Sequence, residues 1–374
     1  MIEERIAGRR VLVCVGAGGV GKTTVSAALA LGLAAQGRRV AVVTIDPARR
    51  LADALGLDEL GNEPHLVDPE RFAGHGIELS GELWAMMLDP KHTFDDLIAQ
   101  LAPDERSRDE ILANRIYQQL SSAVAGSQEF TAIAKLYELH ASARFDVLVL
   151  DTPPSRNALD FLDAPDRLLG FLEGKALRTL LAPTGLAARV LGRGTGMVFG
   201  VLQKLTGVDL LADLSVFFRA LGGLLDGFRQ RATAVKALLA DPATTFLIVS
   251  SPRREPVDEA VFFAGRLADA GMALGGVIVN RVTPAAGLED EPVVVEAALA
   301  QTVGPALAHK VTAAYADARA LAAHEAALID RLRAQAGDPD PLLLAQLGGD
   351  VHDVDGLVRV CHGLFGAGPG WPSN

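Results

Sequence analysis

A glycine-rich segment followed by a lysine and two threonines is the first feature of this chain whose residue types and spacing could do chemistry. It reads GAGGVGKTT over residues 16–24, after the apolar run Val11–Val15 and before an alanine-rich helical pattern. Glycines let successive backbone N–H groups turn toward a phosphate, and the N-terminus of the following helix adds partial positive charge. The spacing GxxxxGK[ST] in this context predicts a phosphate-binding loop.

The positions of this loop have distinct expected roles. We expect Lys22 to neutralise the β- and γ-phosphates of a nucleotide, Thr23 to offer its hydroxyl to Mg²⁺, and Thr24 to reach the α-phosphate. A glycine-rich turn that matches the spacing by chance is the alternative. The other contacts to the nucleotide are expected from Gly16, Gly18, Gly19, Val20 and Gly21.

Two carboxylates follow apolar runs further along the chain. Asp46 comes after Val40–Ile45 and before Pro47, and Asp151 ends the run Val147–Leu150 and is followed by Thr-Pro-Pro. Ligands of open α/β sheets bind at the carboxyl ends of the strands. Both acids are therefore expected at the edge of the sheet that carries the glycine-rich loop.

These acids are predicted to handle water and metal. Asp46 is expected to orient or deprotonate the attacking water, and Asp151 to accept hydrogen bonds from the water shell of a magnesium ion or from Thr23. Thr23, Asp46 and Asp151 together form the predicted Mg²⁺ site, partly through water. The structural alternatives are Asp46 as the N-cap of a helix over Arg49–Leu55 and Asp151 in a turn that ends the strand.

The elements that position these residues can be read from apolar runs that recur between helical patterns. Runs of Val, Ile and Leu without polar alternation are typical of strands buried on both faces. They predict an α/β fold with a doubly wound, mainly parallel sheet covered by helices. The expected strands are Val11–Val15, Val40–Ile45, Leu83–Leu88, Val147–Leu150, Phe246–Ser250, Val277–Val279 and Leu342–Leu344.

The strand pattern is interrupted once, by a helical region rich in Gly and Leu. Residues 1–160 and 241–366 are expected to form the P-loop core, residues 161–240 an inserted helical subdomain, and residues 367–374 a flexible tail. Small and apolar side chains around Phe199 could line a groove for a hydrophobic segment. The alternative is that they pack against the sheet or against a second subunit.

Composition narrows the classes of function. The chain has 374 residues, of which 49% are hydrophobic, and a formal net charge of −11. It can therefore bury a large core, and its acidity argues against a nucleic-acid partner, which is held by clustered Lys and Arg. Charges interrupt the N-terminal segment and the helical region, so we expect no signal peptide, no integral membrane segment and a cytoplasmic location.

Metal chemistry beyond magnesium is not expected. The chain has two cysteines, Cys14 and Cys361, which are too far apart in sequence for a CxxC motif, and its histidines are scattered. Both thiols are interpreted as small apolar residues. A site for arsenite, which needs clustered thiolates, is disfavoured for the same reason.

Four motifs together resemble one family. GAGGVGKTT, TIDPARRLADALG, FDVLVLDTPPS and VIVNR are similar to the motifs of the arsenite-pump ATPases and of the ATPases that target tail-anchored membrane proteins, and the resemblance extends from Arg10 to about Phe365. It implies ATP and Mg²⁺ as cofactors. It also implies a nucleotide-dependent dimer, homodimeric or heterodimeric with a related ATPase, that opens and closes while it handles a hydrophobic protein segment or another ligand.

The resemblance implies roles for single residues as well. Asp46 would position the hydrolytic water, Asp151–Pro154 would form the second switch with Pro154 at the nucleotide, and Asn280 would read adenine. A side-chain amide suits the last role because it both donates and accepts hydrogen bonds. Asn280 as an ordinary turn residue is the alternative. The loop Gln346–His352 has glycines where the family packs a proline-containing turn on the base, which leaves that contact in doubt.

The main departure from the family is Ala17, which stands where the family carries a lysine that reaches the phosphates of the partner subunit. Cations of this kind stabilise the transition state, and arginine fingers contribute about 10³ to 10⁵ in rate. The CxxC zinc clamp of the eukaryotic targeting members is also missing. The chain is therefore expected to hydrolyse ATP slowly as a homodimer, to pair with a related ATPase that carries the lysine, or to use another cation, Arg49, Arg50 or Arg156. Arg156, which stands where the family usually shows a Gly-His pair, is the preferred substitute. An alternative function is an ATP-gated regulatory subunit of a heterodimer with little hydrolysis of its own.

Overall fold

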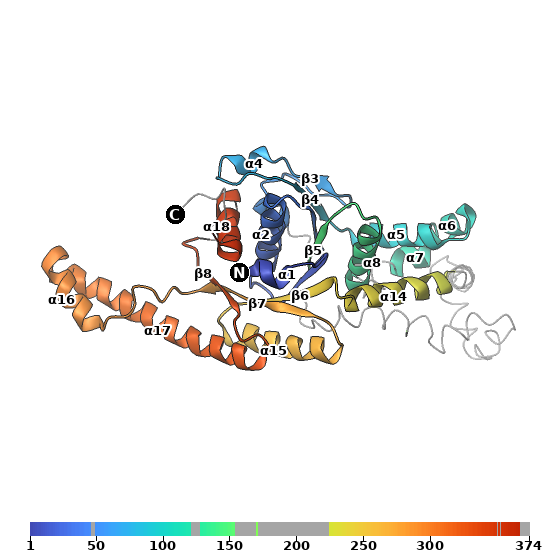
Figure 1. Cartoon of the computed structure of the whole chain (residues 1–374). Helices are drawn as coiled ribbons and strands as arrows, with labels where there is room; N and C mark the ends of the chain where they lie inside the picture. The colour runs from blue at the N-terminus through green and yellow to red at the C-terminus, as the bar shows by residue number, and fades with distance from the viewer. Residues whose placement is uncertain are drawn as a thin grey trace, which may run out of the picture.

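One twisted sheet forms the centre of the molecule (Figure 1). A computed structural model describes residues 1–45, 49–120, 128–153, 170, 224–349, 351 and 353–366. The strands in this part of the chain are β1 Val11–Val15, β2 Arg39–Thr44, β3 His65–Leu66, β4 Glu82–Met87, β5 Val147–Asp151, β6 Thr244–Ser250, β7 Leu274–Val282 and β8 Leu342–Ala345. Their order in the sheet is β3-β4-β2-β5-β1-β6-β7-β8.

The sheet is mainly parallel, as the apolar runs predict. Only the pair of β3 with β4 is antiparallel among the described strands, and every other neighbouring pair is parallel. β1, β5 and β6 are buried along their whole lengths. Uninterrupted apolar sequence is what a strand covered on both faces requires, and the predicted α/β fold class is confirmed.

Two strands differ from the sequence-based expectation by more than one or two residues at an end. β7 continues to Val282, three residues past its expected end, because pairing with β8 resumes at Val282 after an irregularity. Asn280 therefore lies inside a strand and neither follows it nor occupies a turn. β3 was not expected, since His65 and Leu66 are both exposed and leave no pattern of burial in the sequence.

Helices cover both faces of the sheet, so the fold is doubly wound (Figure 1). On one face, the apolar side chains of β1 at Leu12 and Cys14 pack with those of five helices. Two of these helices approach each other closely at Gly32, where a Cβ would lie 2.2 Å from the ring of Phe365. These helices are α1 Ile2–Ile6, α2 Lys22–Ala35, α3 Arg50–Ala54, α4 Glu70–Ala73 and α18 Val354–Phe365.

The opposite face carries a second core, into which Val11, Val13 and Val15 of β1 point. Its helices are α5 Pro90–Leu101, α6 Glu105–Leu112, α7 Arg115–Leu120, α8 Gln128–Ala141, α14 Leu225–Ala240, α15 Arg254–Asp269 and α17 Pro305–Gln335. α16, Pro292–Val303, packs along α17, and the pair projects from the sheet at the left of Figure 1.

The inserted subdomain expected over residues 161–240 is described only at its end. α14 belongs to that range, and its Phe228 and Val235 are buried in the second core. The side chains around Phe199 and the expected tail 367–374 lie outside the described residues. The boundaries of the subdomain stay a prediction.

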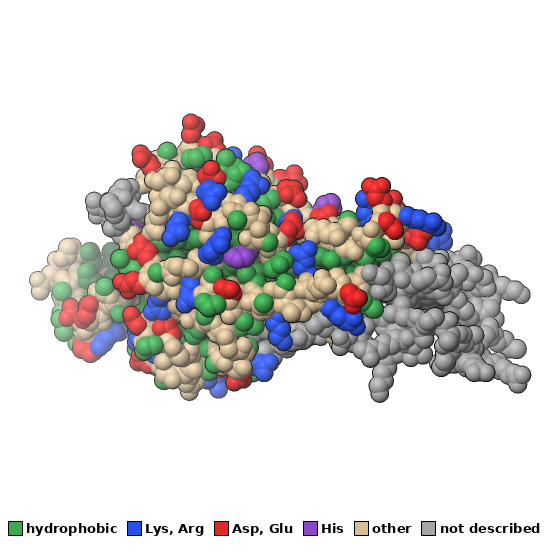
Figure 2. All heavy atoms as spheres, turned by 45° about the vertical axis from the view of Figure 1, so that its right-hand side comes forward, with side chains coloured by type: hydrophobic (Ala, Val, Ile, Leu, Met, Phe, Trp, Pro, Cys, Tyr) green, Lys and Arg blue, Asp and Glu red, His purple; other side chains and the backbone are tan. Residues whose placement is uncertain are grey.

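On the face shown in Figure 2, acidic and basic side chains are interspersed and form no continuous basic stripe. This agrees with the acidic composition of the chain. Within the described ranges, no helix is long and apolar enough to cross a membrane. Cys14 and Cys361 are both buried, and burial raises the pKa of the Cys14 thiol to about 12. Both cysteines are part of the apolar core, as expected.

Candidate nucleotide-binding site

The glycine-rich loop lies between β1 and α2, as predicted. At two of its positions, Gly16 and Gly21, there is no room for a side chain. Gly16 has φ 149° and Gly21 has φ 95°, backbone conformations that side chains rarely adopt. A Cβ on Gly16 would lie 2.0 Å from the carbonyl oxygen of Val249, and a Cβ on Gly21 would lie 2.3 Å from Nδ2 of Asn280. The loop can approach β6 and β7 this closely only with glycine at both positions.

Lys22 begins α2 and folds back over the loop. Its Nζ donates hydrogen bonds to the carbonyl oxygens of Gly16, at 2.9 Å, and Ala17, at 2.8 Å. Lys22 is 6% exposed, so the ammonium group is held where the turn of the loop closes. The methyl group of Ala17 is buried in the apolar core with Val20. The loop therefore presents the Lys22 ammonium and its own backbone, and position 17 offers no polar side chain.

Three side chains meet beneath the loop, at the ends of β2 and β5. The hydroxyls of Thr23 and Thr44 both donate to Oδ2 of Asp151, at 2.7 and 2.8 Å. Asp151 is 1% exposed and Thr44 is 2% exposed. One oxygen of a buried carboxylate thus accepts two hydrogen bonds. The contact between Thr23 and Asp151 is the one that the sequence predicts.

Thr44 is a site residue that the sequence-based reasoning missed. It ends β2 and lies beside Asp151 in the register of the two parallel strands. The signal was present, because a hydroxyl side chain stands next to the end of an otherwise apolar run, two residues before Asp46. A polar residue at the carboxyl end of a central strand is a candidate for the ligand edge of the sheet.

The residues expected to bind Mg²⁺ fit that ion as far as they are described. Thr23 and Asp151 offer a hydroxyl and a carboxylate within hydrogen-bonding distance of each other. Mg²⁺ prefers such hard oxygen donors and keeps several waters, so it needs few protein ligands. No group of three or more His, Cys, Asp or Glu side chains suited to a metal occurs in the described ranges.

Asn280 connects the loop to β7. Its Nδ2 donates to the carbonyl oxygen of Val20 at 2.9 Å, and its Oδ1 accepts from the backbone N–H of Arg281 at 2.9 Å. An amide has two N–H groups and two acceptor lone pairs, so these bonds use one of each. Arg281 itself has φ 61°, which is unusual for a residue with a side chain.

A cavity of about 360 Å³ opens over the loop. The cavity is lined by the start of α2, by β7, and by the segment that follows β8. Its lining residues are Gly19, Gly21, Lys22, Thr23, Thr24, Arg50, Asp53, Thr152, Asn280, Arg281, Ala345, Gln346, Leu347, Gly349, Val351 and Val360. Gly16, Gly18, Val20 and Asp151 lie outside the lining.

The charges of this lining suit a polyanion. Lys22, Arg50 and Arg281 are its basic members and Asp53 its acidic one. Arg281 was not predicted as a lining residue. Gln346 and Leu347 belong to the loop whose contact with the base the sequence left in doubt. The carboxyl edge of the sheet thus holds a concave site with an excess of positive charge, in a chain whose net charge is −11.

Several predicted residues lie outside the described part of the chain, namely Asp46, Pro154 and Arg156. The helix that follows the gap at Asp46, α3, begins at Arg50, and Arg49 occupies its N-cap position. Arg49 has φ 56° and lines a separate small cavity with Thr44 and Met87. Two adjacent arginines therefore face different parts of the molecule.

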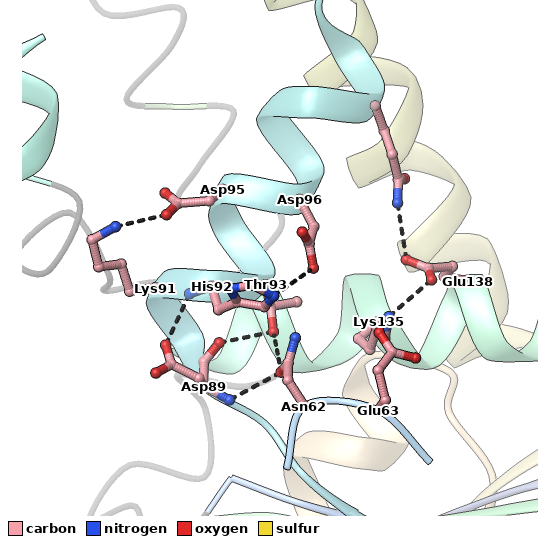
Figure 3. A network of polar contacts seen from close by, with 11 residues as sticks. Asn62, Glu63, Asp89, Lys91, His92, Thr93, Asp95, Asp96, Lys135 and Glu138 are labelled. Carbon is pink, nitrogen blue, oxygen red and sulfur yellow. Dashed lines mark hydrogen bonds and ion pairs between the residues drawn. The ribbon is translucent and has the colours of Figure 1, made fainter. Parts of the chain in front are cut away.

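Hydrogen bonds and an ion pair join the segment after α3 to α5 and α8, which lie on the opposite face of the sheet (Figure 3). Oδ1 of Asn62 accepts hydrogen bonds from the backbone N–H of Asp89, at 3.1 Å, and from the Thr93 hydroxyl at the start of α5, at 3.0 Å. Next to it, Glu63 lies 3.9 Å from the ammonium of Lys135 on α8. The segment after α3 thus contacts α5 through Asn62 and α8 through Glu63.

Comparison with known proteins agrees with the geometry. Residues 9–301 match the model of a family described as anion-transporting ATPase. An uncharacterized protein of Streptomyces coelicolor is 32% identical over 289 residues, which cover 76% of this chain and 64% of that protein. The ATPase GET3 of Malassezia globosa is 28% identical over 274 residues, which cover 72% of each chain.

A putative arsenical pump-driving ATPase 1 of Aquifex aeolicus is 26% identical over 289 residues, which cover 75% of this chain and 65% of that protein. The chain thus spans less than two thirds of the Streptomyces and Aquifex relatives. The matched range includes the glycine-rich loop, Asp151 and Asn280. The chain belongs to the anion-transporting ATPase family, that of the arsenite-pump and tail-anchored-protein-targeting ATPases.

Proposed function

We propose that this chain is a Mg²⁺-dependent ATPase that couples ATP binding and hydrolysis to a conformational change. The observation that carries the proposal is the cluster of Thr23, Thr44 and Asp151 beneath a glycine-rich loop. P-loop ATPases hold magnesium with a Ser or Thr at the start of the loop helix and an Asp at the end of a strand, the positions that Thr23 and Asp151 occupy. The cavity above it has the size and charge for a nucleotide.

In this proposal Lys22 exchanges its two carbonyl acceptors for oxygens of the β- and γ-phosphates. Thr23 and Asp151 would hold the metal, and Thr44 would keep the Asp151 carboxylate in place. Bound Mg²⁺ supplies charge neutralisation of the phosphate oxygens. Asp46 orients the attacking water or accepts its proton, and Asn280 uses its remaining N–H and lone pair for adenine.

The conformational output would run through the segment that follows α3. Asp46 precedes α3 in sequence, and the network around Asn62 and Glu63 joins the end of that segment to α5 and α8. A change at the γ-phosphate would then be transmitted to the helical layer. We propose that this layer, in a homodimer or heterodimer, handles a hydrophobic protein segment or another ligand, and arsenite efflux remains disfavoured by the two buried cysteines.

The test of this function is Asp46→Asn. The variant keeps the size of the side chain and removes the charge that orients water, so ATP affinity should stay within about twofold while turnover falls by about 10² or more. Affinity is measured by calorimetry and turnover by phosphate release. Unchanged turnover would show that Asp46 does not handle the water.

A second candidate function is an ATP-gated regulatory subunit. The buried, apolar Ala17 favours it, because the loop then lacks a cation that could reach a partner's phosphates. The protein alone would bind ATP and hydrolyse it negligibly. A mixture with a related ATPase that carries the lysine should then hydrolyse ATP faster than either protein alone, and an additive rate would count against this function.

A further inference from the structure

We propose that Arg50 supplies, from within the same chain, the positive charge at the γ-phosphate that Ala17 cannot provide. This inference rests on the proposed ATPase function and assigns a further catalytic residue to that site. Arg50 lines the same cavity as Lys22, Thr23 and Thr24, and its side chain is exposed there. Of the three candidate cations that the sequence offered, it is the described one that faces this cavity.

Arg50 is presented by a firmly anchored backbone. The two residues that follow it in α3, Leu51 and Ala52, are 1% and 2% exposed and pack in the core beside α2. The left-handed backbone of Arg49 turns the chain just before the helix. Burial of one side of α3 leaves the Arg50 side chain on the side of the cavity, where a long guanidinium group can reach phosphate oxygens.

The strand order separates Arg50 from the other arginine of the cavity. α3 follows β2, which pairs with β5, so Arg50 belongs to the side of the sheet where Thr44 and Asp151 meet. Arg281 belongs to β7, two strands beyond β1 in the other direction. It adjoins Asn280, the residue proposed for adenine, so the two arginines serve opposite ends of the nucleotide.

A cation in addition to Lys22 and Mg²⁺ would stabilise the transition state at the γ-phosphate end of the nucleotide. Hydrolysis forms a bond from the water oxygen to the γ-phosphorus and breaks the bond to the bridging oxygen, which leaves with its electron pair on ADP. A proton of the water passes to a base or to phosphate. Negative charge builds on the bridging and γ-oxygens during this step, and a guanidinium group donates to such oxygens in bidentate fashion.

The closing experiment compares nucleotide affinities, which can be measured whether or not turnover is fast. A non-hydrolysable ATP analogue and ADP, each with Mg²⁺, are titrated into the wild type, Arg50→Ala, Arg50→Gln and the matched control Arg49→Ala. Loss of a charge-assisted contact to the γ-phosphate should weaken binding of the analogue by about 10- to 100-fold. ADP lacks that phosphate, so its affinity should change by less than about threefold.

The outcomes separate this inference from the proposed function. Selective loss of affinity for the analogue in both Arg50 variants, with Arg49→Ala like the wild type, supports the inference. An unchanged ratio of the two affinities in the Arg50 variants overturns it and leaves the ATPase proposal standing. A wild type that binds neither nucleotide overturns both. Thermal unfolding of each variant verifies that it is folded.

Discussion

Replacement of Thr44 by valine tests the cluster beneath the loop. Valine has nearly the shape of threonine but cannot donate to Asp151, whose Oδ2 the Thr44 hydroxyl reaches at 2.8 Å. A hydrogen bond to a buried charged group contributes about 1.5–3 kcal/mol. Asp151 is 1% exposed, so no water can replace the lost donor easily. The free energy of unfolding should fall by an amount in this range.

The same replacement should weaken the binding of magnesium. In the proposed complex Thr23 and Asp151 hold the metal, and Thr44 is the side chain that keeps the Asp151 carboxylate in place. Loss of a residue that orients a metal ligand typically costs about 10- to 100-fold in metal affinity. We expect Thr44→Val to raise by about 10-fold or more the Mg²⁺ concentration needed for half-maximal binding of the ATP analogue.

Thr245→Val is the matched control. Thr245 is also a fully buried strand threonine, but its hydroxyl donates to a neutral acceptor, the carbonyl oxygen of Ala273, at 3.2 Å. A neutral hydrogen bond contributes about 0.5–1.5 kcal/mol. Urea unfolding and titrations at several Mg²⁺ concentrations compare the two variants. The reasoning is refuted if Thr44→Val loses no more stability than Thr245→Val and requires no more Mg²⁺ than the wild type.

Three further predictions concern other parts of the molecule. Gly21→Ala would place a side chain on a backbone with φ 95° and in collision with the Asn280 amide. The variant should lose about 1–3 kcal/mol of unfolding free energy and bind the nucleotide more weakly. Binding equal to that of the wild type in calorimetry would contradict this. Lys135→Met removes the ion pairs of α8 and should leave ATP affinity unchanged while reducing the nucleotide-induced change in hydrogen exchange of α5 and α8; an unreduced change would exclude this route. Hydrogen bonds from Arg39 lower the pKa of Asp146 to about 2, so the charged carboxylate stabilises the fold above about pH 4 and this contribution is lost as the pH falls toward 2. Because the pair is solvent-screened, Asp146→Asn should lower the unfolding free energy at pH 7 by less than about 1 kcal/mol, and a difference from the wild type that persists at pH 2 would be inconsistent with it.

The parts of the fold that could be predicted are those with a strong local signal. β1, β5 and β6 are uninterrupted apolar runs because both of their faces are covered, and the loop before α2 combines glycines with a fixed spacing to Lys22 and Thr23. Such patterns depend on a few neighbouring residues. They can therefore be recognised in a single sequence.

The remainder depends on contacts between distant segments. Thr44 and Asp151 meet only through the register of β2 with β5, and Asn280 reaches Val20 only because β7 lies near the loop in three dimensions. α17, a helix of 31 residues, gave no clear signal because few of its residues are buried. Arg49 and Arg50 were equivalent in sequence and were separated only by the turn at the start of α3.

The most direct measurement is steady-state ATP hydrolysis by the purified chain, with Mg²⁺ and with excess chelator, beside Lys22→Ala as the control. Mass in solution is recorded with and without a non-hydrolysable ATP analogue. The proposal predicts Mg²⁺-dependent phosphate release that Lys22→Ala abolishes, and a nucleotide-dependent increase in mass. Phosphate release that continues without Mg²⁺ or survives Lys22→Ala, or a failure to bind the analogue, would contradict the assignment of this site as a P-loop ATPase.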